Sequence, residues 1–229
     1  MRNRLFLFKL MMAALCMFPV SGAVAQVLSA GRTAERAKAE DFIIFPWGTV
    51  PSPDFTAGAW GDMTSPDALM KDLFDCGYNA TGFIPAEYVP YAAPYRLATI
   101  LYDSRVAAHP DVTLQQAEET VKAVLDEIKS PEMRKNVYSI YIKDEPNASL
   151  FPRLNLWAEA IRKQGILPYI NLFPDYASDG QLGSAGYEAH LDEFVNACHP
   201  KYISYDNYSL YGDTLNEDRF YGNLETTRK

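Results

Sequence analysis

Short apolar runs alternate with helix-like segments from residue 42 to residue 229, and this alternation limits the possible folds more than any other feature of the sequence. Each run has six to eight residues, and each is followed by a segment that is predicted to be helical. Alternating strands and helices form parallel sheets with right-handed crossovers. The predicted strands cover residues 42–47, 78–84, 97–103, 138–145, 167–173 and 201–208.

The helix-like segments have recognisable ends. Ser65 is predicted to cap the first helix, Pro66 occupies its first turn, and Gly77 closes it. The second segment, residues 85–96, contains prolines at 85, 90 and 94, so we expect only short, poor helix there. The remaining helices are predicted at about 113–129, 150–163 and 187–198, with a last one beginning near 216.

Two architectures fit this order, an open doubly wound sheet and a (β/α)8 barrel. A doubly wound sheet buries both of its faces, so its strands are apolar almost throughout. Here one face of most strands is polar, and no glycine-rich phosphate turn follows the first strand. We therefore predict an α/β fold, a TIM barrel that is incomplete, with about six βα units present. The polar pairs are Asn79 and Thr81, Thr99 and Asp103, Lys143 and Glu145, Tyr169 and Asn171, and Ser204 and Asp206.

The first 25 residues have the pattern of an export signal. A basic start is followed by a mainly apolar run over residues 5–20, and Ala23-Val24-Ala25 has the small residues of a cleavage site. A membrane anchor fits less well, because the apolar run is short and Lys9 interrupts it. We predict cleavage after Ala25 and a secreted or periplasmic protein. Residues 26–40 would then be an N-terminal linker, and residues 41–229 the partial barrel domain.

Cleavage would leave a strongly acidic chain. It would remove Arg2, Arg4 and Lys9 from a chain with 21 basic and 29 acidic residues, which leaves 18 basic residues and a net charge of about −11. Such a charge disfavours nucleic acids and anionic membranes as partners. It is compatible with a neutral ligand such as a sugar, and we expect no membrane association after cleavage.

The stretch 138–146 has the strongest chemical signal in the chain. Alternation places Asp144 on the same strand face as Ile142 and places Glu145 on the opposite face. Pro146 cannot donate to a strand ladder, so the strand is expected to end there. Two adjacent carboxylates are thus predicted at the carboxyl end of the fourth strand, where α/β proteins place their chemistry.

The other strand ends supply further polar and aromatic side chains, which a barrel would gather at one end. Carboxylates and amides bind sugar hydroxyls, and aromatic rings stack on the apolar faces of pyranose rings. The three histidines lie away from these strand ends, so we expect neither a histidine metal site nor a Ser-His-Asp triad, and no cofactor. The candidate substrate-binding residues are Asp144, Trp47, Asp103, Asn171, Asp206, Asn207 and Tyr208.

Asp144-Glu145-Pro146 resembles the strand-four Asn-Glu-Pro signature of the retaining (β/α)8 glycoside hydrolases, a clan that includes β-galactosidases. The resemblance covers about residues 41–229. It implies hydrolysis of O-glycosidic bonds by carboxylate general acid/base catalysis, with Glu145 as the catalytic acid/base. The family has Asn where this chain has Asp144, and an ionised Asp can only accept a hydrogen bond from the sugar 2-hydroxyl.

Glycoside hydrolysis requires a second carboxylate, which is a nucleophile about 5 Å from the acid/base in retaining enzymes and a base roughly 6.5–9.5 Å away in inverting enzymes. In the family it is a Glu on strand seven, so the resemblance implies that this chain is a fragment lacking that nucleophile. Asp206 or Asp103 could serve instead. The alternative function is a non-catalytic carbohydrate-binding barrel, in which Asp144 and Glu145 only bind hydroxyl groups.

Overall fold

The computed structural model describes residues 42–48, 65–107 and 112–228. The chain divides after Phe42, and the described residues from Ile43 onward belong to one compact unit. The predicted signal peptide (1–25), the linker (26–40) and the predicted start of the domain at residue 41 lie outside the described residues. Among the helices that the structure describes, none has the length and apolar character needed to cross a membrane.

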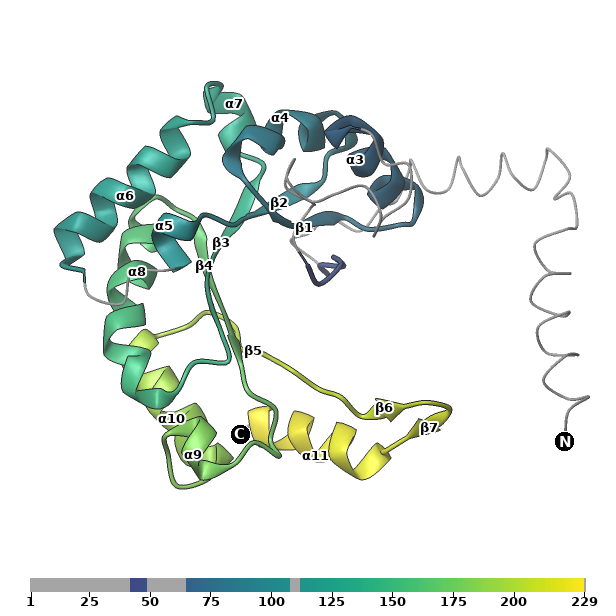
Figure 1. Cartoon of the computed structure of the whole chain (residues 1–229), viewed down its shortest axis with the longest axis vertical. Helices are drawn as coiled ribbons and strands as arrows, with labels where there is room; N and C mark the ends of the chain where they lie inside the picture. The colour runs from purple at the N-terminus through teal and green to yellow at the C-terminus, as the bar shows by residue number, and fades with distance from the viewer. Residues whose placement is uncertain (1–41, 49–64, 108–111, 229) are drawn as a thin grey trace, which may run out of the picture. The chain divides into compact units, whose positions relative to one another are not determined.

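Five parallel strands form one sheet in the order β1-β2-β3-β4-β5, which is also their order along the chain (Figure 1). This sequential order is that of a (β/α) barrel, whereas a doubly wound sheet reverses its order at a switch point. The predicted α/β fold, an incomplete TIM-type barrel, is therefore confirmed. The strands are β1 (Ala80–Ile84), β2 (Ala98–Leu101), β3 (Val137–Asp144), β4 (Leu167–Leu172) and β5 (Ser204–Tyr205).

The helices begin close to where the sequence predicts. The side chain of Ser65 accepts a hydrogen bond from the Ala68 N–H at the start of the first helix, and Thr113 and Gln116 form a capping box. The proline-rich segment after β1 forms only short turns, as expected. The helical elements up to β3 are α3 (Pro66–Asp75), η1 (Ala86–Tyr88), α4 (Val89–Ala92), η2 (Ala93–Tyr95), α5 (Ser104–Ala107), α6 (Leu114–Asp126) and α7 (Pro131–Arg134); those after it are η3 (Ala148–Leu150), α8 (Phe151–Lys163), α9 (Asp179–Leu182), α10 (Tyr187–Cys198) and α11 (Glu217–Arg228).

The long helices α6 and α8 cover one face of the sheet (Figure 1). α8 contacts α6, α10, β3 and β4, so it is the central element of this layer. The main apolar core lies between the helices and the strands, and Trp157 of α8 is its largest fully buried side chain. The strands contribute Ile84, Leu101, Ile140, Ile142, Ile170 and Leu172 to this core.

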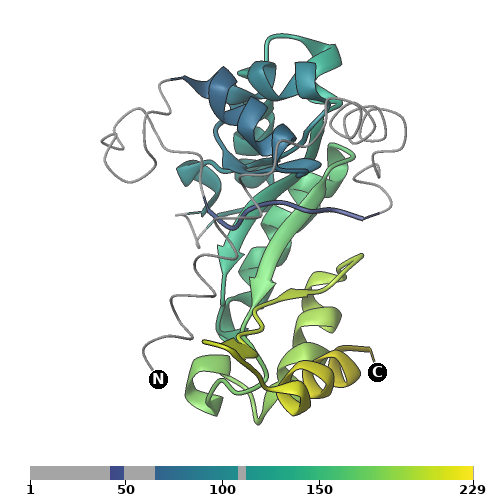
Figure 2. The ribbon, with the colours of Figure 1, turned by 90° about the vertical axis from the view of Figure 1, so that its right-hand side faces the viewer.

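The opposite face of the sheet, which Figure 2 presents to the viewer, carries a second, aromatic cluster. Its rings contact one another at angles, as in Phe83 with Tyr141, whose centroids are 4.7 Å apart. In a barrel this face corresponds to the interior. The cluster is built from Phe83, Ile100 and Tyr169, with Phe45, Tyr141 and Tyr202 packed against them.

The first predicted strand, residues 42–47, is not a strand, but its residues 43–47 lie beside β1. The Ile44 carbonyl accepts the Asn79 N–H (3.1 Å), whereas the Ile44 N–H donates to the Asn79 side chain (2.7 Å) and not to a strand carbonyl. A Cβ on Gly82 would lie 2.2 Å from the Gly48 carbonyl oxygen, so the glycine permits this close approach. The sheet therefore has five strands where six were predicted.

The last predicted strand, residues 201–208, is also shorter than expected. β5 has two residues, and the Asp206 N–H extends its pairing to the Leu172 carbonyl (3.1 Å). After β5 the chain forms an antiparallel hairpin that was not predicted from the sequence. Gly212 has a φ of 60° in the turn of this hairpin. Its strands are β6 (Leu210–Tyr211) and β7 (Thr214–Leu215).

An extra residue in β3 changes which face Asp144 occupies. Tyr141 pairs with Tyr169, but after a register shift Asp144 pairs with Asn171. Without the shift, Asp144 would lie beside Leu172, whose side chain belongs to the helix-covered core. The bulge thus places Asp144 on the aromatic face, and the predicted position on the face of Ile142 is wrong.

Candidate active site at the carboxyl end of the sheet

Three neighbouring strands end in polar side chains that meet at one point. Asp144 ends β3, Asn171 lies near the end of β4, and Asp206 directly follows β5. The Asn171 side-chain amide donates to Asp144 Oδ1 (3.0 Å) and to Asp206 Oδ1 (2.8 Å). One amide therefore connects carboxylates that are 62 residues apart in the sequence. This convergence follows from parallel strands, which bring their carboxyl ends to the same edge.

Glu145 completes this group of carboxylates. Its backbone has a φ of 43°, in the left-handed region, and its N–H donates to the Asn171 carbonyl (2.8 Å). Partial burial, a hydrogen bond shared with Asp206, and the negative charges of Asp206 and Asp144 together raise the pKa of Glu145 to about 7. The Glu145 carboxyl group thus retains a proton near neutral pH. Asp144, Glu145 and Asp206 are called the carboxylate triad below.

Asp144 has a weaker form of the same perturbation. Partial burial raises the pKa of Asp144, and the charge of Asp206 adds to this effect. The hydrogen bond from Asn171 and the nearby charge of Lys143 act in the opposite direction. The triad is therefore a set of coupled acids in which each negative charge disfavours the next.

Asn171 does not lie where a ligand could reach it. Only 2% of the residue is exposed, and both hydrogens of its amide are used by the two aspartates. Its side-chain oxygen accepts the Ser204 hydroxyl (2.7 Å), which lies 3.1 Å from the Tyr169 hydroxyl. The predicted substrate-binding role of Asn171 thus has no free polar group to support it.

Aromatic side chains lie on the same face of the sheet as the triad. The Tyr208 hydroxyl donates to Asp206 Oδ2 (3.2 Å), and this ring is 59% exposed. Trp47 is 52% exposed, and the centroid of its ring lies 5.1 Å from that of Phe83. Tyr176 lies near enough to Glu145 for that charge to raise its pKa, although burial has the larger effect. Tyr208 thus contacts the triad directly, whereas Trp47 contacts the aromatic cluster; their substrate-binding role stays a prediction.

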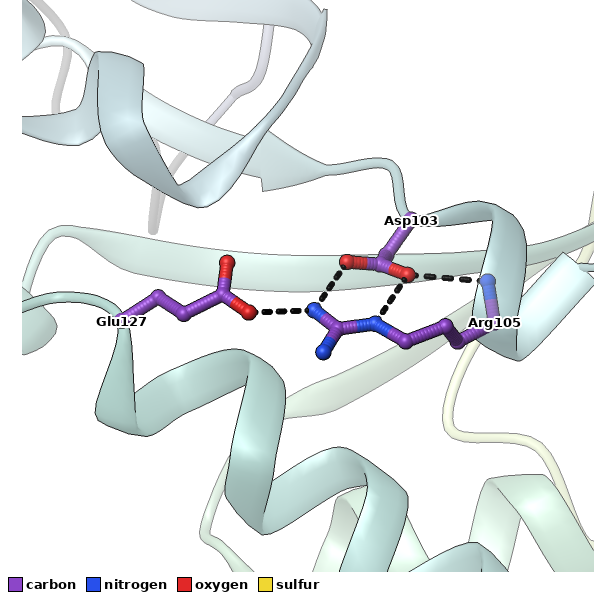
Figure 3. Close-up of polar contacts among 3 residues, drawn as sticks. All are labelled: Asp103, Arg105 and Glu127. Atoms are coloured by element: carbon purple, nitrogen blue, oxygen red, sulfur yellow. Dashed lines mark hydrogen bonds and ion pairs between the residues drawn. The ribbon is translucent and has the colours of Figure 1, made fainter.

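Asp103 is separate from the triad. Arg105 donates to both of its carboxylate oxygens (2.9 and 2.6 Å) and also to Glu127 (2.6 Å), as Figure 3 shows. Partial burial raises the pKa of Asp103, but the hydrogen bonds from Arg105 outweigh this effect and hold it below its usual range. Asp103 thus links the end of β2 to the end of α6 through Arg105.

Asn207 turns away from the exposed part of the site. Its side-chain oxygen accepts the Ser209 hydroxyl, and its side-chain nitrogen is buried without a partner among the described residues. The residues missed by sequence reasoning are Ser204 and Tyr169, which orient Asn171. The sequence could have indicated them only by spacing, because Ser204 lies two residues before Asp206 and Tyr169 two residues before Asn171, on the polar strand faces.

Within the described ranges, no three side chains of His, Cys, Asp or Glu are grouped so that they could hold a metal ion. No family model matches the chain, and no curated protein matches it. Among solved structures, the chain is similar to a xylose isomerase domain protein from Alicyclobacillus acidocaldarius subsp. acidocaldarius, with a TM-score of 0.38 and 10% identity. The match covers 62% of this chain and 58% of that chain. This likeness concerns the fold alone.

Proposed function

We propose that this chain hydrolyses O-glycosidic bonds and that Glu145 is the general acid. The observation that carries the proposal is the convergence of Asp144, Glu145 and Asp206 at the carboxyl end of the sheet, where burial and the neighbouring carboxylates raise the pKa of Glu145 to about 7. A carboxyl group that keeps its proton near neutral pH can protonate the oxygen of a leaving group. The resemblance of Asp144-Glu145-Pro146 to the Asn-Glu-Pro signature supports the same role.

The two aspartates would serve Glu145 in different ways. After burial, Asp206 is the main cause of the raised pKa of Glu145, because its hydrogen bond and its negative charge both disfavour ionisation of Glu145. We therefore assign to Asp206 the task of keeping the proton on Glu145. Asp144, which is partly exposed, would accept a hydrogen bond from a sugar hydroxyl and would be the second carboxylate that hydrolysis requires. As Glu145 protonates the leaving oxygen and the glycosidic bond breaks, a water molecule would add to the anomeric carbon and give its proton to Asp144.

The exposed aromatic rings support a carbohydrate as the ligand. Trp47 and Tyr208 are each more than half exposed, on the sheet face that carries the triad. Flat rings beside hydroxyl-binding carboxylates are the mixture that sugar sites use. The predicted export signal agrees with this proposal, because a secreted or periplasmic protein meets extracellular sugars.

The test compares two aryl glycosides in the wild type and in Glu145→Gln. A phenyl leaving group needs protonation, so its hydrolysis should fall by about 10²- to 10⁴-fold in the variant. A dinitrophenyl leaving group departs without a proton, so its hydrolysis should be nearly unchanged. Glu225→Gln, an exposed carboxylate on α11, is the matched control. Equal losses with both substrates would argue against proton donation by Glu145.

The alternative is a non-catalytic carbohydrate-binding barrel. The exposed rings of Trp47 and Tyr208 favour it, because stacking platforms need no catalytic acid. Calorimetry with oligosaccharides separates the two functions. A wild-type protein that binds sugars without turnover, and a Glu145→Gln variant with the same affinity, would establish binding in place of hydrolysis.

A further inference from the structure

Asn171 has contacts with all three members of the carboxylate triad. Its amide donates to Asp144 and Asp206, and its backbone carbonyl accepts the Glu145 N–H. These bonds leave its side chain 2% exposed and without a free hydrogen. Its chemistry is therefore directed at the carboxylates and not at a ligand.

The direction of these hydrogen bonds determines where negative charge is favoured. An N–H that donates to a carboxylate stabilises the ionised form. The Asp206 carboxylate accepts such a bond from the Asn171 amide. Glu145 contacts Asn171 only through the backbone, where the Glu145 N–H donates to the Asn171 carbonyl. Of the Glu145 and Asp206 side chains, only that of Asp206 receives a hydrogen bond from the Asn171 amide, so the geometry favours the proton on Glu145.

We propose that Asn171 is a positioning residue that holds the shared proton on Glu145 by donating to Asp206 and Asp144. The catalytic importance of Asn171 rests on the proposed function of Glu145 as general acid. The position of the proton on Glu145 does not depend on that function, because it is a property of the carboxylate triad.

The orientation of the Asn171 amide is itself fixed. The Ser204 hydroxyl donates to its oxygen (2.7 Å) and lies beside the Tyr169 hydroxyl (3.1 Å). A flipped amide would place its oxygen against two carboxylates and its nitrogen against a donor hydroxyl, which costs hydrogen bonds on both sides. Ser204 therefore selects the orientation in which the N–H groups face the triad.

The other titratable groups near Glu145 come from several elements, and a substitution at Asn171 leaves all of these side chains in place. A change in the titration of Glu145 would thus report on the amide. Facing Glu145 or its neighbours are Asp144 and Lys143 of β3, Asp206 and Tyr208 after β5, and Tyr176 after β4, whose ring Arg219 of α11 covers.

The test is a ¹³C NMR titration of the Glu145 carboxyl in the full chain, with the resonance assigned by its loss in Glu145→Gln. Asn171→Leu removes both donors and keeps the branched shape of the side chain. We expect the titration midpoint of Glu145 to fall by about one pH unit, because the proton moves toward Asp206. A midpoint that is unchanged in folded Asn171→Leu would overturn the proposal.

Two further variants keep the test decisive. Ser204→Ala leaves the amide in place but releases its orientation, so we expect a smaller shift in the same direction, and this variant replaces Asn171→Leu if the latter does not fold. Asn155→Leu removes a carboxamide from α8, where it bonds Glu159 and Arg162, and should cause no shift. An equal shift in Asn155→Leu, or none in Ser204→Ala when it is the only folded variant at the site, would overturn the proposal.

The titration needs no substrate, so its outcome is independent of glycoside hydrolysis. A protein without hydrolytic activity whose Glu145 midpoint falls in Asn171→Leu would sustain the role of Asn171 and refute the proposed function. An active enzyme whose midpoint does not move would refute the role of Asn171 alone.

Discussion

Glu145 has a backbone conformation that residues other than glycine seldom adopt. A φ of 43° places it in the left-handed region, which costs about 1–3 kcal/mol unless the surroundings compensate. The hydrogen bond from its N–H to the Asn171 carbonyl holds the residue there. The strand thus ends at Asp144, and the Glu145 side chain meets Asp206 instead of continuing the alternation of β3.

At the scale of single residues, Asp206→Asn should lower the pKa of Glu145. The substitution removes a negative charge and a proton-sharing partner, which raise that pKa together with burial. A general acid acts while protonated, so the wild-type rate should fall as pH rises through about 7. In Asp206→Asn the fall should occur about one pH unit lower.

Profiles of kcat/KM against pH measure this shift. Asp213→Asn, an exposed carboxylate in the β6–β7 turn, should leave the profile in place. Superimposed profiles of the wild type and Asp206→Asn would contradict the assigned role of Asp206.

At the scale of elements, β3 illustrates what the sequence can predict. Alternation located the strand to within about one residue, and Pro146 marked its end. The extra residue between Tyr141 and Lys143 could not be predicted, because no glycine or proline marks the bulge. The position of Asp144 beside Asn171 depends on the register with β4, which is a long-range property.

Gly82→Ala should displace residues 46–48 from β1. The added Cβ would lie 2.2 Å from the Gly48 carbonyl oxygen and 2.9 Å from that of Pro46, so backbone must move. We expect a loss of about 1–3 kcal/mol in unfolding free energy and a change in the fluorescence of Trp47. Gly222→Ala, where a Cβ meets nothing within 4 Å, is the control for chemical denaturation. Equal stabilities of the two variants would show that the close approach is not needed.

Asp103→Asn should affect stability slightly and hydrolysis hardly at all. Asp103 links β2 to α6 through Arg105 and Glu127, and Arg105 is 44% exposed, so we expect a loss of about 1 kcal/mol or less. Because Arg105 binds both carboxylate oxygens of Asp103, we expect no catalytic role for Asp103, and kcat/KM should stay within about twofold of the wild type. A tenfold loss of kcat/KM in a folded Asp103→Asn protein would place this residue in the site after all.

At the scale of the whole molecule, the strand order could be predicted because periodicities of 2 and 3.6 residues are local. The convergence of Glu145, Asp144 and Asp206 could be predicted as well, since parallel strands end together. The ion pair of Asp103 with Arg105, two residues later, was not predicted. The pairing of residues 42–47 could not be predicted, since it depends on the side chain of Asn79.

The stability of the folded chain should depend on the protonation of Glu145. Its pKa is about 4.5 when unperturbed and about 7 in the folded chain, so the native state holds a proton that the unfolded state releases between these values. Stability should therefore fall as pH rises from about 4.5 to 7. Glu145→Gln has no proton to lose and should be more stable than the wild type above pH 7, by about 1 kcal/mol after allowance for solvent screening.

Urea denaturation of both proteins at pH 5 and pH 8 measures this difference. Glu225→Gln serves again as the control and should follow the wild type at both values. A Glu145→Gln protein that is less stable than the wild type at pH 8 would contradict the raised pKa.

The most direct test of the central claim is the titration midpoint of the Glu145 carboxyl in the wild-type chain, measured by ¹³C NMR. Burial and the two neighbouring aspartates predict a midpoint of about 7. A midpoint near 4.5, the ordinary value for a glutamate, would mean that Glu145 is ionised at neutral pH and cannot be the general acid.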